Sequence, residues 1–217
     1  MKVEIWSDFM CPFCYIGKRK FENAVARFAN KDDLQIRWRS FQLAPDMVTD
    51  TEKNVYDYLA DKKGWTPDYS KKVHDQVSAT AQEAGLEYDF DKAVPANSFK
   101  AHRLSHLAAS HGLQDLAEER LFAAYFTEGK NIDDTATLVR LGTEIGLPAD
   151  EVNRALQTDE YTSEVHQDLA EARQVGVRAV PFFVFDDKYA VSGAQPSDVF
   201  LGALEKSYLE QAPKNNS

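Results

Sequence analysis

The stretch DFMCPFCYIG, residues 8–17, holds both cysteines of the chain, Cys11 and Cys14, in a C-x-x-C motif. It directly follows a short apolar segment, residues 3–6. A cysteine pair with this spacing, placed between a strand and a helix, is typical of a redox-active dithiol. The motif therefore sets the first expectation for both the fold and the chemistry.

The positions of the two cysteines predict different roles for them. A thiolate is the attacking species in disulfide exchange, and a helix N-terminus favours negative charge. Cys11 lies at that terminus and is predicted to be the nucleophile. Cys14, one turn later on the same side, is predicted to be the resolving thiol. An alternative use of a C-x-x-C is half of a zinc site, for which His102 and His106 are candidate ligands at helical spacing.

Length, charge and hydropathy exclude several classes of protein. A chain of 217 residues has room for one large domain, or for one domain with an insertion. Its net charge of -10 disfavours binding to nucleic acid. No stretch approaches the roughly 18 apolar residues that span a bilayer. The N-terminus lacks the pattern of a secretory signal, so we expect a cytoplasmic setting, where a cysteine pair is more often catalytic or metal-binding than a structural disulfide.

The order of predicted elements indicates an α/β domain that is interrupted by helices. Residues 2–7 predict a strand, a helix follows from Pro12, and residues 34–43 alternate like a second, half-buried strand. Between residues 51 and 176 only helical patterns occur. Strand patterns return at 177–185 and 189–191, before a last helix over 196–210.

A second motif, AVPFFVF at residues 179–185, opens a strand with Pro181. Taken alone, such a proline marks only a strand start or an edge. In thioredoxin-like folds, however, a cis-proline loop faces the dithiol, and a cis peptide bond is a rare feature outside X-Pro. Together with the C-x-x-C motif, the sequence predicts a cis bond between Val180 and Pro181, packed against the cysteines.

Five segments together resemble the DsbA-like thioredoxin family, specifically its FrnE-like branch of mostly cytosolic thiol oxidoreductases. They are CPFCYIG (11–17), FQLAP (41–45), NSFKAHR (97–103), LFAAYFTEGKNI (121–132) and GVRAVPFFVFDDKYAVSGAQ (176–195). The resemblance covers nearly the whole chain. It departs from the family pattern at Ser98, where threonine is more frequent.

The resemblance implies a thioredoxin-like α/β fold with an inserted all-helical domain that covers the active site. Residues 1–47 and 158–217 are then the two parts of the thioredoxin-like domain, and residues 48–157 form the helical lid. The family also implies that Cys11 is the nucleophile. Val180 and Pro181 match its cis-proline dipeptide, so the expected catalytic residues are Cys11, Cys14 and Pro181.

The expected substrate-binding residues come from both parts of the chain: Pro12, Phe13, Val180, Asn97, His102 and Arg103. The last three belong to the NSFKAHR segment, and a cation there would favour a thiolate. Each of the three also has an ordinary structural explanation, because Asn97 is a candidate helix cap and the other two are candidate packing or surface residues.

The leading functional hypothesis is a thiol-disulfide oxidoreductase or isomerase without a cofactor or metal. Its expected substrates are protein or small-molecule thiols and disulfides, glutathione among them, and it is expected to act as a monomer or homodimer. The direction of exchange depends on a reduction potential. Kappa-class glutathione transferases and 2-hydroxychromene-2-carboxylate isomerases are similar in architecture, but they typically place serine where this chain has Cys11. A zinc-stabilised interaction module is the non-enzymatic alternative.

Overall fold

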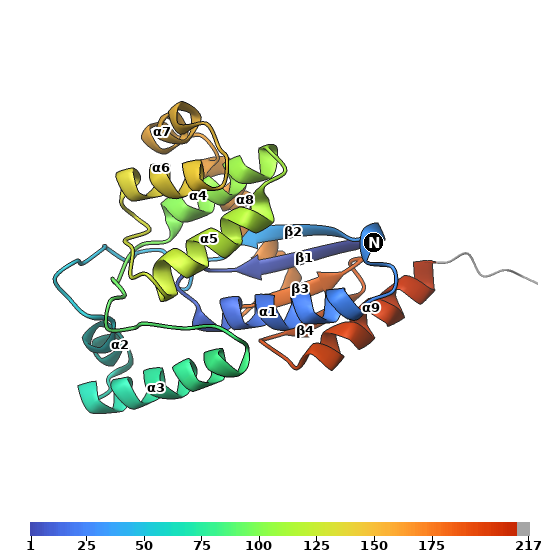
Figure 1. The fold of residues 1–217 in the computed structure, drawn as a ribbon, viewed down its shortest axis with the longest axis horizontal. Coiled ribbons are helices and arrows are strands. Elements are labelled where there is room, and N and C mark those ends of the chain that lie inside the picture. Colours follow the sequence, from blue (N-terminus) through green and yellow to red (C-terminus); the bar gives the residue numbers. More distant parts are fainter. Residues whose placement is uncertain (212–217) are drawn as a thin grey trace, which may run out of the picture.

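The computed structural model describes residues 1–211, which fold around a mixed, four-stranded sheet in the order β2-β1-β3-β4 (Figure 1). The strands are β1 (Lys2–Ser7), β2 (Gln35–Ser40), β3 (Phe182–Phe185) and β4 (Tyr189–Ser192). β1 pairs in parallel with β2 and antiparallel with β3, which pairs antiparallel with β4. The predicted α/β fold with a helical insertion is confirmed.

Helices cover both faces of the sheet and extend beyond one end of it. They are α1 (Pro12–Arg27), α2 (Val55–Lys63), α3 (Pro67–Glu83), α4 (Phe99–Ser110), α5 (Gln114–Phe126), α6 (Thr135–Glu144), α7 (Ala149–Gln157), α8 (Thr162–Val175) and α9 (Ser197–Gln211), with a short 3₁₀ turn at Lys31–Asp33. The helices α2 to α7 separate β2 from α8 in the sequence and gather toward the carboxyl end of β1 (Figure 1). No helix within the described chain is both long and apolar enough to cross a membrane.

Local sequence signals explain where several of these helices begin and end. The side chains of Asn54, Thr66 and Asp134 accept backbone N–H groups at the starts of α2, α3 and α6. Gly176 ends α8 with a φ of 85°, a conformation that glycine adopts without steric cost. These residues therefore set the ends of helices within the region, residues 51–176, where the sequence predicts only helical patterns.

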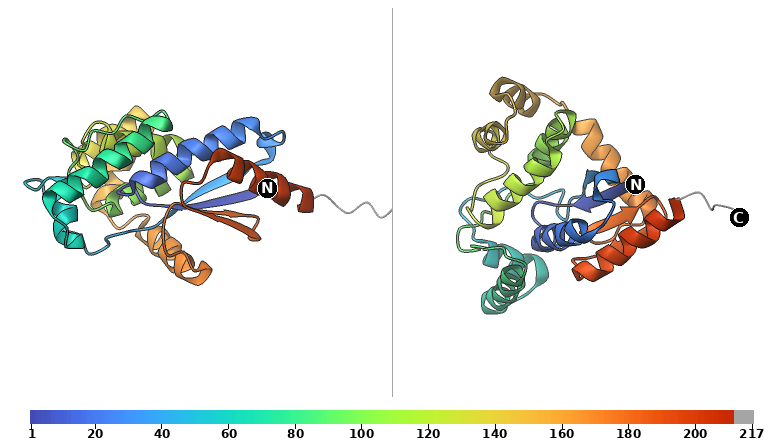
Figure 2. Two further views of the ribbon diagram at one scale, coloured as in Figure 1. Left: turned by 90° about the horizontal axis from the view of Figure 1, so that it is seen from below. Right: turned by 45° about the vertical axis from the view of Figure 1, so that its right-hand side comes forward.

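Alternating side chains of β1 divide the core into two layers. Val3 and Ile5 point to the face covered by α1 and α9, where they belong to a largely aromatic cluster. Trp6 belongs to the other cluster, which continues into the helical insertion. In the left view of Figure 2, α1 (blue) and α8 (orange) lie on opposite sides of the sheet. The two faces of this strand therefore belong to different parts of the core.

Two strands are shorter than the sequence predicts. Residues 177–181 precede β3 as irregular chain. The Val180 carbonyl is turned toward the Cys11 thiol, and the Pro181 carbonyl accepts the N–H of Gly193, the residue after β4. β2 ends at Ser40, and its alternation places Arg39 on the polar side. The structure buries Arg39 nonetheless, because it lies beneath α8.

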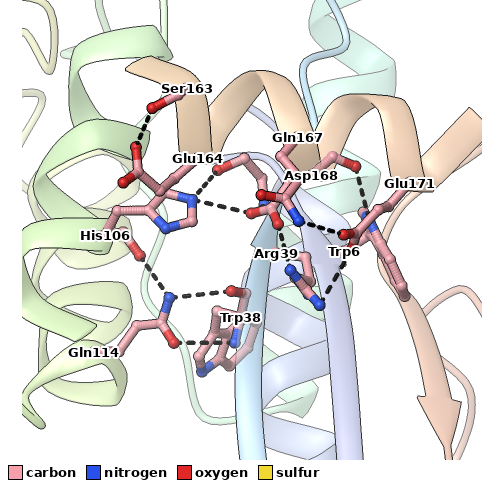
Figure 3. A network of polar contacts seen from close by, with 12 residues as sticks. Trp6, Trp38, Arg39, His106, Gln114, Ser163, Glu164, Gln167, Asp168 and Glu171 are labelled. Carbon is pink, nitrogen blue, oxygen red and sulfur yellow. Dashed lines mark hydrogen bonds and ion pairs between the residues drawn. The ribbon is translucent and has the colours of Figure 1, made fainter. Parts of the chain in front are cut away.

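Arg39 is the centre of a buried ionic network (Figure 3). Its guanidinium donates to Glu4 on the adjacent strand β1 through Nε at 2.8 Å, and to Asp168 of α8 through a second nitrogen at 2.7 Å. Glu171 lies 3.1 Å from the same guanidinium. The charges therefore compensate one another inside the protein, which a buried ion requires.

Asp168 also ties the helical insertion to the sheet. One carboxylate oxygen accepts the Ser40 N–H at 2.8 Å and lies 2.9 Å from His106 Nε2 of α4. Burial by itself would raise the pKa of Asp168, but the hydrogen bonds from His106 and from the Ser40 N–H hold it below its ordinary value. Ser40 Oγ contacts the same His106 nitrogen as Asp168 does. In a hydrolytic Ser-His-Asp triad, the serine and the aspartate contact different ring nitrogens, so these three residues do not form one.

We predict that Asp168→Asn lowers the free energy of unfolding at pH 7 by about 1–3 kcal/mol, because the carboxylate accepts hydrogen bonds from Arg39, the Ser40 N–H and His106, and a buried amide cannot accept all of them. The folded-state pKa of Asp168 is depressed, so its contribution is present above about pH 4 and is lost as the pH falls through the folded pKa. Urea unfolding at several pH values should therefore show wild type and variant converging in acid.

The matched control is Asp198→Asn, which breaks the exposed ion pair with Arg27 and should cost less than about 1 kcal/mol. Equal losses in the two variants, or a difference that does not shrink in acid, would contradict the structural role assigned to Asp168.

Candidate functional site

The two cysteines lie at the turn between β1 and α1. Cys11 is the N-cap residue of α1, and Pro12 occupies the first helical position, where a missing N–H has no consequence. The Cys11 N–H donates to the carbonyl of Asp8 at 2.9 Å, and the Cys14 N–H donates to the carbonyl of Cys11 at 3.0 Å. Both side chains are free thiols. Cys11 is 5% exposed and Cys14 is fully buried, so a reagent from solvent reaches Cys11 first.

The Cys14 thiol is shielded from ionisation. Burial raises its pKa well above the ordinary value, and the neighbouring Cys11 side chain raises it further. The Ser7 hydroxyl and the Asp8 N–H act in the opposite direction, because each places a positive dipole end near the sulfur. Negative charge on Cys14 therefore depends on these few donors.

The predicted cis peptide bond between Val180 and Pro181 is confirmed, and the loop lies against the dithiol. The Cys11 thiol donates to the Val180 carbonyl at 3.4 Å. Pro181 packs directly on α1 at Gly17, where a Cβ atom would lie 2.7 Å from the proline Cγ. The loop thus reaches the first turns of α1 because residue 17 has no side chain.

The helical insertion supplies Tyr88, which lies in the segment between α3 and α4. Its hydroxyl donates to the Pro12 carbonyl, within the C-x-x-C turn, at 2.7 Å. Its ring stacks near that of Tyr15, with centroids 6.2 Å apart. Burial, and then the neighbouring Cys11, raise the pKa of Tyr88. Sequence reasoning missed this residue, because no local spacing relates position 88 to position 12.

An apolar pocket of about 340 Å³ opens beside Cys11. Pro12 and Phe13 line it on the dithiol side, and the Phe13 side chain is 43% exposed. Helices α2 and α3 supply the opposite wall, which is mostly apolar but carries Lys62 and Lys63. The pocket thus offers apolar surface beside the more exposed thiol and two lysines on its opposite wall.

His102 reaches the same turn from α4. Its ring lies 4.8 Å from the ring of Phe9, and its Nε2 is 3.5 Å from a carboxylate oxygen of Asp8. Asp8 is fully buried, and its two oxygens accept the N–H groups of Met10 and Leu43. The structure therefore places His102 against Phe9 and Asp8, in the turn that precedes Cys11.

Asn97 and Arg103 are held by other contacts. The Asn97 side chain donates to the carbonyls of Pro45 and Met47 and accepts the N–H of Phe99, so it fastens the loop after β2 to the start of α4. The Arg103 guanidinium donates to the carbonyl of Ala155 in α7 and to those of Thr158 and Glu160 in the turn that follows it. The expectation that Arg103 faces the dithiol is wrong, because this side chain binds that turn.

The ligands considered for zinc point to different partners. His106 contacts Asp168 and Ser40, and His102 faces Asp8. Within residues 1–211, no group of three or more histidine, cysteine or carboxylate side chains is arranged to hold a metal ion. The side chains around the cysteines instead form a dithiol site with an apolar pocket.

A family model and two similar proteins each match nearly the whole chain. The model of the DSBA-like thioredoxin domain matches residues 2–205. The crystal structure of a probable DsbA oxidoreductase from Streptomyces coelicolor superposes with a TM-score of 0.91 at 36% identity, and covers 100% of this chain and 94% of that one. The uncharacterized protein YwbO of Bacillus subtilis is 29% identical, over 93% of this chain and 94% of its own.

A more distant structure shares the fold. The cytosolic disulfide reductase DsbM from Pseudomonas aeruginosa, also determined with GSH, is 18% identical and has a TM-score of 0.65. The match covers 97% of this chain and 98% of DsbM.

We predict that Gly17→Ala displaces the Pro181 loop from α1 and lowers the free energy of unfolding by about 1–3 kcal/mol, the usual cost of overpacking. The new methyl group would lie 2.7 Å from a proline ring carbon that has little freedom to move. The measurements are urea unfolding and the rate at which the dithiol reacts with an aromatic disulfide, which should also fall.

Gly202→Ala in α9 is the matched control, because a Cβ there meets no atom within 4 Å. It should leave the thiol reactivity unchanged and raise stability by up to about 1 kcal/mol through helix propensity. A Gly17→Ala variant as stable and as reactive as Gly202→Ala would show that the close approach is dispensable.

Proposed function

The chain belongs to the DSBA-like thioredoxin domain family, and we propose that it catalyses thiol-disulfide exchange through Cys11 and Cys14. The observation that carries this proposal is the unequal placement of two free thiols at one helix start. Cys11 stands at the N-terminus of α1 and borders the pocket, whereas Cys14 is fully buried behind it. Such a pair suits an attacking thiol and a resolving thiol.

The proposed cycle uses both thiols in order. The Cys11 thiolate attacks a substrate disulfide, forms a mixed disulfide and expels the first substrate thiolate, which takes up a proton. Cys14 then loses its proton and attacks the Cys11 sulfur, and the second substrate thiol leaves. The substrate is thereby reduced, and Cys11 and Cys14 become a disulfide. Run in reverse, the same steps oxidise a substrate dithiol.

We propose that substrates place an apolar group in the pocket beside Cys11. Pro12 and Phe13 supply apolar surface there, and the Val180 carbonyl lies at the sulfur to which the substrate becomes attached. Lys62 and Lys63 favour a carboxylate at the opposite wall. These features suit an extended peptide or a small anionic thiol such as glutathione, and the structure of DsbM with GSH supports including the latter.

We further propose that residues 48–157 act as a lid over a thioredoxin-like domain made of residues 1–47 and 158–217. Support comes from α2 and α3, which wall the pocket, and from Tyr88 and His102, which reach the turn at Cys11. Arg103 holds the lid's last turn instead of the substrate.

The rival activities, glutathione transfer and 2-hydroxychromene-2-carboxylate isomerisation, are less well supported. The similar enzymes with these activities typically carry serine at the position of Cys11, and a second, buried thiol at Cys14 has no use in their reactions. The dithiol is the feature that separates the two chemistries.

We predict that Cys11→Ser abolishes exchange with a model disulfide substrate, whereas Cys14→Ser stops after one attack. The second variant should accumulate a covalent adduct at Cys11 with substrate or glutathione, because no thiol is left to resolve it. Intact mass measurement detects the adduct.

The same trapped adduct tests the proposed lid. Because α2 and α3 are proposed to cover the bound substrate, hydrogen exchange of the adduct should show new protection of the backbone amides in these two helices.

Full activity of Cys11→Ser in a glutathione-dependent transfer or isomerisation assay would overturn the redox assignment. Protection that is absent from α2 and α3 in the trapped adduct would contradict the lid while leaving the exchange chemistry intact.

A further inference from the structure

Unpartnered polar atoms are rare in protein interiors, and here they include a hydroxyl at the active site. In the described part of the chain, the buried side-chain atoms without a hydrogen bond of normal geometry are Ser7 Oγ, Ser70 Oγ, His102 Nε2 and Glu118 Oε2. Two of these four atoms lie at the turn that carries the cysteines. Ser7 directly precedes Asp8 in that turn, and His102 contacts the Asp8 side chain. A buried group left without a partner is costly and calls for an explanation.

The position of Ser7 at the end of β1 directs its hydroxyl toward α1, the helix that carries Cys14. Ser7 is the last residue of β1, and it follows Val3 and Ile5 on the face that α1 covers. Its carbonyl accepts the Phe41 N–H at 2.9 Å, so the backbone is satisfied by the loop after β2. The hydroxyl lies near the Cys14 sulfur, where it favours negative charge.

We propose that the Ser7 hydroxyl donates a hydrogen bond to the Cys14 thiolate that forms while Cys14 resolves a mixed disulfide at Cys11. This inference rests on the proposed function. In the resting dithiol the thiol is a weak acceptor, so the hydroxyl has no partner of normal geometry. A thiolate is a strong acceptor, and a hydroxyl rotates freely to meet it.

The step balances without any further reactant. Cys14 gives up its proton, its sulfur bonds to Cys11 Sγ, and the bond between Cys11 and the substrate sulfur breaks. The departing substrate thiolate takes up a proton, so the net change is one disulfide exchanged for another. Ser7 keeps its own proton throughout and serves only as a donor.

The surroundings of Cys14 make this donor important. The titratable groups around Cys14 on the packed elements include Cys11, Asp8, Tyr15, Lys18, Tyr88 and His102. Lys18, one helical turn after Cys14, is paired with Glu22 and Glu119, and the Tyr88 hydroxyl donates to Pro12. Besides Ser7, the donor that lowers the cost of charge on Cys14 is the Asp8 N–H.

The test is the two-phase reaction of the reduced protein with dithiobis(nitrobenzoic acid), which releases one coloured thiolate at each step. The first phase reports attack by Cys11, and the second, independent of reagent concentration, reports resolution by Cys14. Ser7→Ala should leave the first phase within about twofold and slow the second about tenfold, as expected for a lost hydrogen bond to a charged group. The pH midpoint of the second phase should also move upward.

Ser70→Ala is the matched control, since it removes another buried, unpartnered hydroxyl, which lies on α3. A second phase in Ser7→Ala that equals wild type at every pH, or that slows equally in Ser70→Ala, would overturn the role of Ser7. A wild-type protein with no first phase that depends on Cys11 would instead overturn the proposed function itself.

Discussion

The burial of the Cys14 thiol under the first turn of α1 is the constraint on which the rest of the site depends. A disulfide between Cys11 and Cys14 requires both sulfurs at one helix start, whereas selective attack requires that only one of them meets solvent. Three contacts hold this turn in place. Pro181 packs closely on Gly17, the Tyr88 hydroxyl donates to the Pro12 carbonyl, and the Val180 carbonyl accepts a hydrogen bond from the Cys11 thiol. Each of these contacts comes from a segment far away in the sequence.

The buried charges extend the same constraint to the helical insertion. Without a fixed position for α4, the approach of His102 to the turn would not be defined. The carboxylate of Asp168 joins His106 of α4 to Arg39 of β2 (Figure 3). The pairing of Arg39 with Glu4 carries the network into β1, the strand that ends beside the dithiol. Charges that could not be left unpaired therefore orient the insertion over the sheet.

The sequence predicted the parts of the structure that rest on local signals. The spacing of Cys11 and Cys14, the alternation in β1 and the helical periods each depend on neighbouring residues. The cis bond at Pro181 was predicted from a local pattern combined with the distant C-x-x-C motif. The missed features depend on contacts between distant segments: Tyr88 has no motif, and Arg39 reads as a surface residue of a half-buried strand until α8 covers it. Arg103 was misplaced because one helix face is compatible with either the dithiol or the turn after α7.

The most direct test of the account is the equilibrium of the Cys11–Cys14 pair with a glutathione redox buffer, followed by acid quenching and intact mass. The account predicts that the protein passes between a dithiol and a single internal disulfide, with a defined reduction potential and only traces of glutathione adduct. A stable adduct at Cys11 with no internal disulfide at any ratio of oxidised to reduced glutathione would contradict it, because Cys14 would then not be a resolving thiol.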